Sequence, residues 1–291
     1  MRRHRNLPTL TSRLNGRFPK KLVHYFQLYL YFHKLLGIIL TTWRKQMTYD
    51  LGVRLAAEFI GTAIMVLLGN GSVANVDLKG TKGNGSDWLL IAVGYGAGVM
   101  IPAMMFGAIS GNHINPAFTL GLAASGMFPW SEVLPYIAVQ MAGAMFGQLL
   151  VVAAYKPHYD LTTNTQHVLG TFSTISATKS KLNGFVNEFI GSYILFIGAL
   201  GITKAPFFQN NLGTAHMGLG FLVATLVASL GGPTGPALNP ARDLGPRILH
   251  ALLPLKHKGS SDWGYSWVPV VAPILAAILA VFTYKVLFIK G

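Results

Sequence analysis

The tripeptide Asn-Pro-Ala occurs twice in this chain, as Asn115-Pro116-Ala117 and Asn239-Pro240-Ala241. Asn is a favoured helix N-cap, and Pro is favoured at the first helical position because its missing N–H costs nothing there. Each copy therefore predicts the start of a short helix with partial positive charge at its N-terminus. If the two starts face each other, the amides of Asn115 and Asn239 can bind a neutral polar molecule, and the two positive helix ends repel cations.

A cation, Arg242, follows the second tripeptide within its first expected helical turn. A charged residue in apolar membrane sequence is a functional candidate, and the five N–H donors of a guanidinium can bind solute hydroxyls. The alternative is a structural contact of Arg242 with Asp243 or with a loop carbonyl. Asp243 points to a different side of the helix, so we expect it to fix a loop through a partner such as Arg247.

His113 stands two residues before Asn115, in the segment that precedes the first tripeptide. No nucleophile, general base or metal-ligand spacing accompanies it. We therefore expect His113 to shape the site by packing or hydrogen bonding. The chain is expected to be no enzyme and to use neither a metal nor a cofactor.

Two carboxylates lie at equivalent places in apolar sequence. Glu58 begins Glu-Phe-Ile-Gly-Thr, and Glu188 begins Glu-Phe-Ile-Gly-Ser. Such a pair suits a proton relay, which would make the chain a proton-coupled secondary transporter. We favour a structural role, in which each carboxylate accepts hydrogen bonds from the Asn-Pro-Ala segment of its own half.

The elements that hold these residues are expected to be membrane-spanning helices. The chain is 52% hydrophobic and 11% charged, with a mean hydropathy of +0.46, which is typical of membrane proteins. About 20 apolar residues cross a bilayer, and six stretches are long enough: 51–74, 88–109, 132–155, 183–203, 213–231 and 265–288. The segments 113–125 and 237–250 are too short to span. We predict an all-α membrane protein with six transmembrane helices and two re-entrant half-helices.

The order of these segments indicates an inverted repeat. Span, span, short segment and span occur in residues 47–156 and again in residues 182–291. Since each repeat crosses the membrane an odd number of times, the second copy is inverted relative to the first. The two half-helices then enter from opposite faces and meet near the midplane.

Residues 1–46 form a basic N-terminal extension with ten Lys/Arg and no Asp/Glu. The extension is interfacial or disordered, or else it precedes a natural start at Met47. By the positive-inside rule it is cytoplasmic, and next to a membrane domain we expect no nucleic-acid partner. The chain has no Cys, which excludes disulfides and thiolate metal sites.

Residues 47–291 resemble the major intrinsic protein family, which comprises the aquaporins and the glycerol facilitators. The resemblance rests on both Asn-Pro-Ala motifs, the paired Glu-Phe-Ile-Gly segments and the sequence Asn-Pro-Ala-Arg at 239–242. It implies one pore per subunit and a homotetramer in the plasma membrane. Asp243, Arg247, Tyr155 and Pro269-Val270 favour the glycerol-conducting branch over the water-selective one, which remains the alternative.

The resemblance also implies that Tyr95, Val227, Pro236 and Arg242 form the narrowest part of the pore. Water-selective members have His at the position of Val227, whereas Val leaves a wider and more apolar opening. Tyr95, Val227 and Pro236 replace the Trp, Gly and Phe of the usual glycerol filter, so we expect broader selectivity. The expected solutes are glycerol, water, dihydroxyacetone, urea, hydrogen peroxide and undissociated lactic acid.

Overall fold

The computed structural model describes residues 49–289, together with Tyr25, Leu28, Tyr29 and Tyr31. The chain divides into two units, Met1–Tyr49 and Asp50–Gly291. The expectations for the basic extension, residues 1–46, fall outside the described residues apart from those four.

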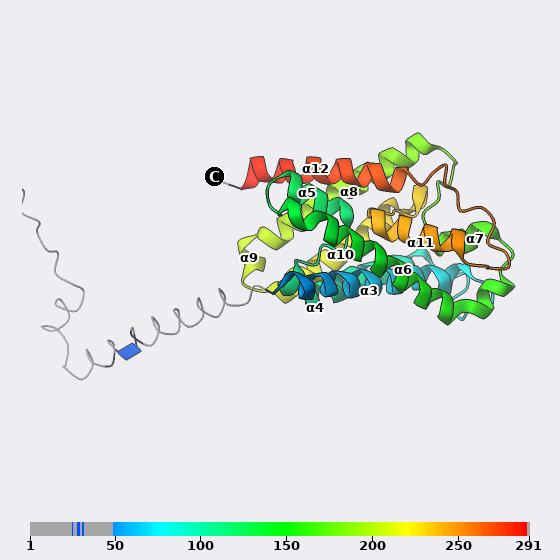
Figure 1. Cartoon of the computed structure of the whole chain (residues 1–291), viewed down its shortest axis with the longest axis horizontal. Coiled ribbons are helices and arrows are strands. Elements are labelled where there is room, and N and C mark those ends of the chain that lie inside the picture. Colours follow the sequence, from blue (N-terminus) through cyan, green and yellow to red (C-terminus); the bar gives the residue numbers. More distant parts are fainter. Residues whose placement is uncertain (1–24, 26–27, 30, 32–48, 290–291) are drawn as a thin grey trace, which may run out of the picture. The chain divides into compact units, whose positions relative to one another are not determined.

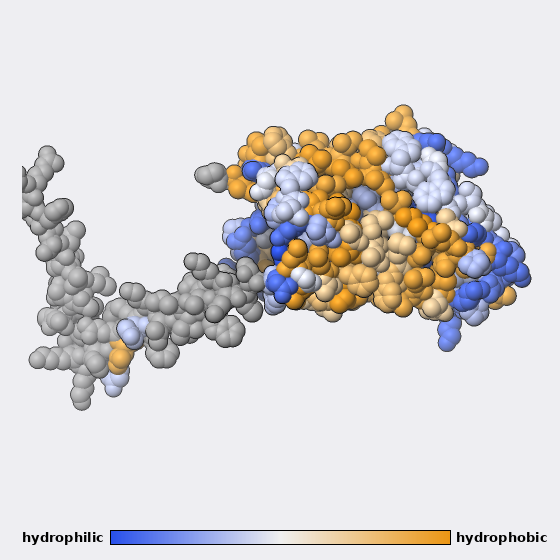
Figure 2. Space-filling view, viewed as in Figure 1, coloured by the Kyte–Doolittle hydropathy of each residue, from blue (hydrophilic) through white to orange (hydrophobic). Residues whose placement is uncertain are grey.

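The second unit is built of helices, and its described residues contain no strand. Six helices are long and apolar enough to cross a membrane, so the predicted fold class is confirmed. Figure 2 shows hydrophobic residues over the middle of this unit and hydrophilic residues gathered toward its ends. The six helices are α3 (Leu51–Asp77), α4 (Trp88–Ser110), α6 (Trp130–Leu161), α8 (Lys181–Lys204), α10 (Leu212–Thr234) and α12 (Val268–Phe288).

Two shorter helices begin at the repeated tripeptides. They are α5 (Pro116–Ala124) and α11 (Pro240–Leu252), with Asn115 and Asn239 as their N-caps. Each lies in the chain between the second and third spanning helices of its repeat (Figure 1). Two further short helices, α7 (Thr165–Gly170) and α9 (Pro206–Gln209), were not expected from the sequence.

The ends of the spanning helices differ from the predicted ones at several residues, and the largest difference is at the end of α6. Helix α6 continues to Leu161, beyond the predicted end at residue 155, and Lys156 pairs with Asp160 at 2.6 Å on this added turn. Such i,i+4 pairs stabilise a helix where the apolar pattern has already ended. Helix α12 begins at Val268 rather than at residue 265, because the preceding residues form a turn in which Tyr265 N–H donates to the Asp262 carbonyl.

The half-helices are held in place by spanning helices of the opposite repeat. Helix α5 packs mainly on α12, and α11 packs mainly on α6. Small residues allow these approaches: a Cβ at Gly121 would lie 3.0 Å from the backbone of Ala277, and one at Gly245 would lie 3.1 Å from Ala144 Cβ. Crossed packing of this kind brings the N-termini of α5 and α11 together.

Candidate functional site

The two Asn side chains join the repeats by a reciprocal pair of hydrogen bonds. Asn115 Nδ2 donates to the Leu238 carbonyl at 2.9 Å, and Asn239 Nδ2 donates to the Ile114 carbonyl at 2.7 Å. Each Asn Oδ1 caps its own half-helix by accepting from the backbone N–H two residues on, at 3.0 and 2.9 Å. The structure thus brings the two predicted Asn residues to one point. Asn115 keeps one further Nδ2 hydrogen, whereas Asn239 Nδ2 also donates to Met65 Sδ at 3.6 Å.

The residue before each Asn has a left-handed backbone conformation. Ile114 has φ 40° and Leu238 has φ 54°, which costs a non-glycine residue on the order of 1–3 kcal/mol. Such strain persists only where the surroundings hold it. Here Ile114 N–H donates to Glu58 Oε2 at 2.6 Å, and Leu238 N–H donates to Glu188 Oε2 at 2.9 Å.

Glu58 is fully buried and accepts four hydrogen bonds. Besides Ile114 N–H, its donors are Ser110 Oγ at 2.7 Å, His113 N–H at 2.8 Å and Gln140 Nε2 at 2.9 Å. Three of these donors lie in the segment that leads into α5. The carboxylate therefore fixes the backbone ahead of Asn115.

Glu188 does the same for the second repeat. It is fully buried and accepts from Thr234 Oγ1, Ala237 N–H and Leu238 N–H, each at 2.9 Å. Neither Glu58 nor Glu188 lines the two cavities described below. Both carboxylates thus have bonds that suit a structural role, and neither has the access to a cavity that a proton relay needs.

Two cavities share part of their lining. The first has a volume of about 400 Å³ and is lined by Asn115, Asn239 and His113 among others. The second has a volume of about 220 Å³, and its lining includes the polar residues Gln166, Ser173, Thr174 and Thr234. Four lining residues are common to both cavities: Tyr95, Val227, Pro236 and Arg242. These are the four residues that the resemblance placed at the narrowest point.

Arg242 is 3% exposed and reaches this junction from the first turn of α11. Its Nη1 donates to the Phe172 carbonyl at 3.3 Å, and its Nη2 donates to the Tyr95 hydroxyl. Its Cζ lies 4.9 Å from the centroid of the Tyr95 ring. Arg242 Nε is buried and has no hydrogen-bond partner, which is costly for a donor.

His113 forms part of the wall of the larger cavity. Its Nδ1 lies 3.1 Å from Thr119 Oγ1, and its ring lies 4.8 Å from the Phe128 ring and 5.2 Å from the Tyr136 ring. These contacts fix the imidazole on three sides. Among the described residues there is no group of His, Cys, Asp and Glu that could hold a metal.

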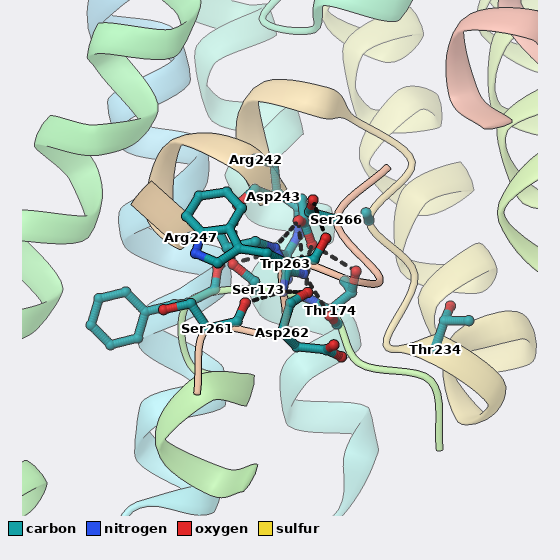
Figure 3. Close-up of polar contacts among 12 residues, drawn as sticks. Ser173, Thr174, Thr234, Arg242, Asp243, Arg247, Ser261, Asp262, Trp263 and Ser266 are labelled. Carbon is teal, nitrogen blue, oxygen red and sulfur yellow. Dashed lines mark hydrogen bonds and ion pairs between the residues drawn. The ribbon is translucent and has the colours of Figure 1, made fainter. Parts of the chain in front are cut away.

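Asp243 and Arg247 form a buried ion pair that anchors α11 to two loops (Figure 3). Arg247 Nε donates to Asp243 Oδ1 at 2.9 Å, and Arg247 Nη groups donate to the carbonyls of Thr174 at 2.8 Å and Ser261 at 2.7 Å. Asp243 Oδ2 accepts from the Thr174 N–H and hydroxyl, both at 2.7 Å. Tyr265 lies in the same loop as Ser261. Burial and nearby carboxylates raise the pKa of its hydroxyl, so this phenol stays neutral.

Sequence reasoning missed the buried polar residues next to Tyr95. Asn70 on α3 and Gln148 on α6 are fully buried, and Asn70 contacts Tyr95, Gln148 and the Phe172 carbonyl. The signal was present, because a polar side chain inside an apolar span marks a candidate functional position. Their partners could not be found, since these contacts join residues 25 to 102 positions apart.

The comparisons with known proteins agree with this arrangement. The family model "Major intrinsic protein" matches residues 46–284. "Glycerol uptake facilitator protein-like 5" of Lactiplantibacillus plantarum is 56% identical over 248 residues, covering 83% of this chain and 99% of the relative. "Glycerol facilitator-aquaporin gla" of Lactococcus lactis subsp. cremoris is 48% identical over 284 residues, covering 81% and 98%.

A solved structure shows the same architecture. The aquaglyceroporin from Plasmodium falciparum superposes with a TM-score of 0.73 at 27% identity, and the match covers 82% of this chain and 98% of that one. The relatives are named as facilitators and channels rather than as enzymes. This chain is a multi-pass membrane protein and not an enzyme, and it belongs to the major intrinsic protein family.

Proposed function

We propose that this protein is a passive channel for glycerol, water and other small neutral solutes. The observation that carries the proposal is the junction of the two cavities, where four of the described residues, Tyr95, Val227, Pro236 and Arg242, line both. Val227 and Pro236 give an apolar wall that suits a carbon backbone, and the Arg242 donors suit hydroxyls. Relatives named glycerol uptake facilitators support glycerol as a solute.

The broader list of solutes follows from the same four residues. Only one wall of the junction is aromatic, and none of the four is His. We therefore include dihydroxyacetone, urea, hydrogen peroxide and undissociated lactic acid. A water-selective channel is disfavoured because Val227 stands where such channels place a donor.

Exclusion of ions and protons is the second part of the proposal. The N-termini of α5 and α11 meet at Asn115 and Asn239, and their partial positive charges oppose a cation there. A proton-coupled transporter is disfavoured because Glu58 and Glu188 are buried in hydrogen bonds away from both cavities. We place the protein in the plasma membrane as a homotetramer in contact with lipid, with a cytoplasmic N-terminus.

Stopped-flow light scattering of proteoliposomes tests this function. Vesicles with the protein should re-swell in glycerol, dihydroxyacetone and urea faster than protein-free vesicles, without saturation and without dependence on a pH gradient. If water permeability rises while every organic solute behaves as in empty vesicles, the channel is water-selective. If glycerol flux saturates and requires a proton gradient, the protein is a transporter.

A further inference from the structure

The ring of Tyr95 lies directly against the backbone of α3 at Gly69. A Cβ added to Gly69 would lie 2.2 Å from Tyr95 Cε1, 2.3 Å from Cδ1 and 2.7 Å from Cζ. Carbon atoms in ordinary contact are about 3.5–4.0 Å apart. Only glycine at position 69 therefore leaves room for the ring where it lies.

The hydroxyl of Tyr95 is fixed at the same time from two sides. It donates to Asn70 Oδ1 and accepts from Arg242 Nη2. Asn70 is itself held, because its Nδ2 donates to Gln148 Oε1 at 2.6 Å and to the Phe172 carbonyl at 3.1 Å. The ring cannot shift along α3 without breaking bonds in this buried network.

We propose that Gly69 is a specificity-determining residue, although it lines neither cavity. By admitting the Tyr95 ring against α3, Gly69 keeps the ring at the wall of the junction and out of its open space, and the Asn70 network holds the ring there. The width of the junction then depends on α3, although α3 contributes none of the four side chains that line both cavities. Gly69 acts through Tyr95 and is a positioning residue. The proposal rests on the proposed channel function.

The test is Gly69→Ala in proteoliposomes, with Gly71→Ala as its matched control. A Cβ at Gly71, two positions along the same helix, meets no atom within 4 Å. In Gly69→Ala the 2.2 Å contact with Tyr95 Cε1 has to lengthen by roughly 1.3–1.8 Å to become an ordinary contact. We expect glycerol permeability to fall about tenfold or more, as for one methylene of misfit in a fitted site. Water permeability should fall less, and Gly71→Ala should behave as wild type.

A second background separates this effect from a folding defect. In Tyr95→Ala there is no ring to displace, so adding Gly69→Ala should leave the glycerol-to-water permeability ratio unchanged. Two results together support the proposal. The glycerol-to-water permeability ratio is lower in Gly69→Ala than in the wild type, and the double variant has the same ratio as Tyr95→Ala.

Two results overturn the inference. One is a glycerol-to-water ratio in Gly69→Ala equal to that of Gly71→Ala. The other is an equal fall in the ratio with and without Tyr95. Failure of the channel function itself is distinct, because the wild-type protein would then conduct no glycerol.

Discussion

Around Asn115 the carboxylate of Glu58 accepts four hydrogen bonds, whereas around Asn239 the carboxylate of Glu188 accepts three. The hydroxyl donors, Ser110 and Thr234, are equivalent in the two repeats, as are the two backbone N–H groups that each carboxylate binds. The extra donor in the first repeat is Gln140. The scaffold that holds each Asn is therefore nearly the same in both halves.

What this scaffold presents to the cavities differs between the halves. Phe118 in the first repeat corresponds to Arg242 in the second, and Asn112 corresponds to Pro236. Among the residues that the structure describes, only the second half adds a fully buried ion pair, Asp243 with Arg247, that fixes loops at its end of the molecule. The comparison teaches that the shared residues hold the two Asn residues in place, and we propose that the unshared ones decide what passes.

The largest expected effect is on the shared scaffold. Glu58→Ala leaves four buried donors without an acceptor, and each costs about 1–3 kcal/mol. Glu188→Ala leaves three, so it should destabilise the protein less. In detergent, the thermal unfolding temperature of Glu58→Ala should be lower than that of Glu188→Ala. Glu132→Ala breaks a half-buried ion pair with Arg54, and its unfolding temperature should be higher than that of both other variants. A reversed order of the first two would break the comparison.

The next effect concerns the ion pair that only the second repeat has. Arg247→Met leaves the Asp243 carboxylate fully buried and unpaired, which costs about 3–5 kcal/mol. The matched control, Lys156→Met, breaks an exposed pair of the same i,i+4 spacing, worth about 0–1 kcal/mol. Thermal unfolding in detergent should show a large fall for the first variant and almost none for the second. Equal falls would mean that burial does not distinguish the pairs.

A smaller effect tests the unshared positions in the cavity wall. Arg242→Leu removes charged donors that replace water around a solute hydroxyl, a loss of roughly 1.5 kcal/mol or tenfold in glycerol permeability relative to water. Phe118→Leu, at the equivalent position, keeps an apolar wall and should change this ratio little. Stopped-flow measurements of glycerol and water permeability in the two variants give this ratio. Similar ratios in the two variants would show that the asymmetry does not set selectivity.

Much of the fold could be predicted because its signals are local. Six apolar runs and two Asn-Pro starts define the helices, and the odd number of spans per repeat sets their inverted order. The extra turn of α6 could not be predicted from hydropathy, since a polar ion pair extends it. Helices α7 and α9 were missed because six- and four-residue helices carry no apolar period.

The site divides in the same way. Asn115, Asn239 and Arg242 are marked by their own motif, and the resemblance supplied Tyr95, Val227 and Pro236. The left-handed backbone at Ile114 and Leu238 could not be read from residue type, because branched residues rarely adopt it. The contact of the Tyr95 ring with Gly69 depends on packing between α3 and α4, which no local sequence pattern encodes.

The central claim, that these four residues form the selective constriction of a solute channel, is tested most directly by Val227→His. In proteoliposomes, stopped-flow traces for glycerol and for water are compared between this variant and the wild type. The larger side chain and its added donor should narrow the junction, so glycerol permeability should fall about tenfold or more while most water permeability remains. Unchanged glycerol permeability, or an equal fall for both solutes, would contradict the account.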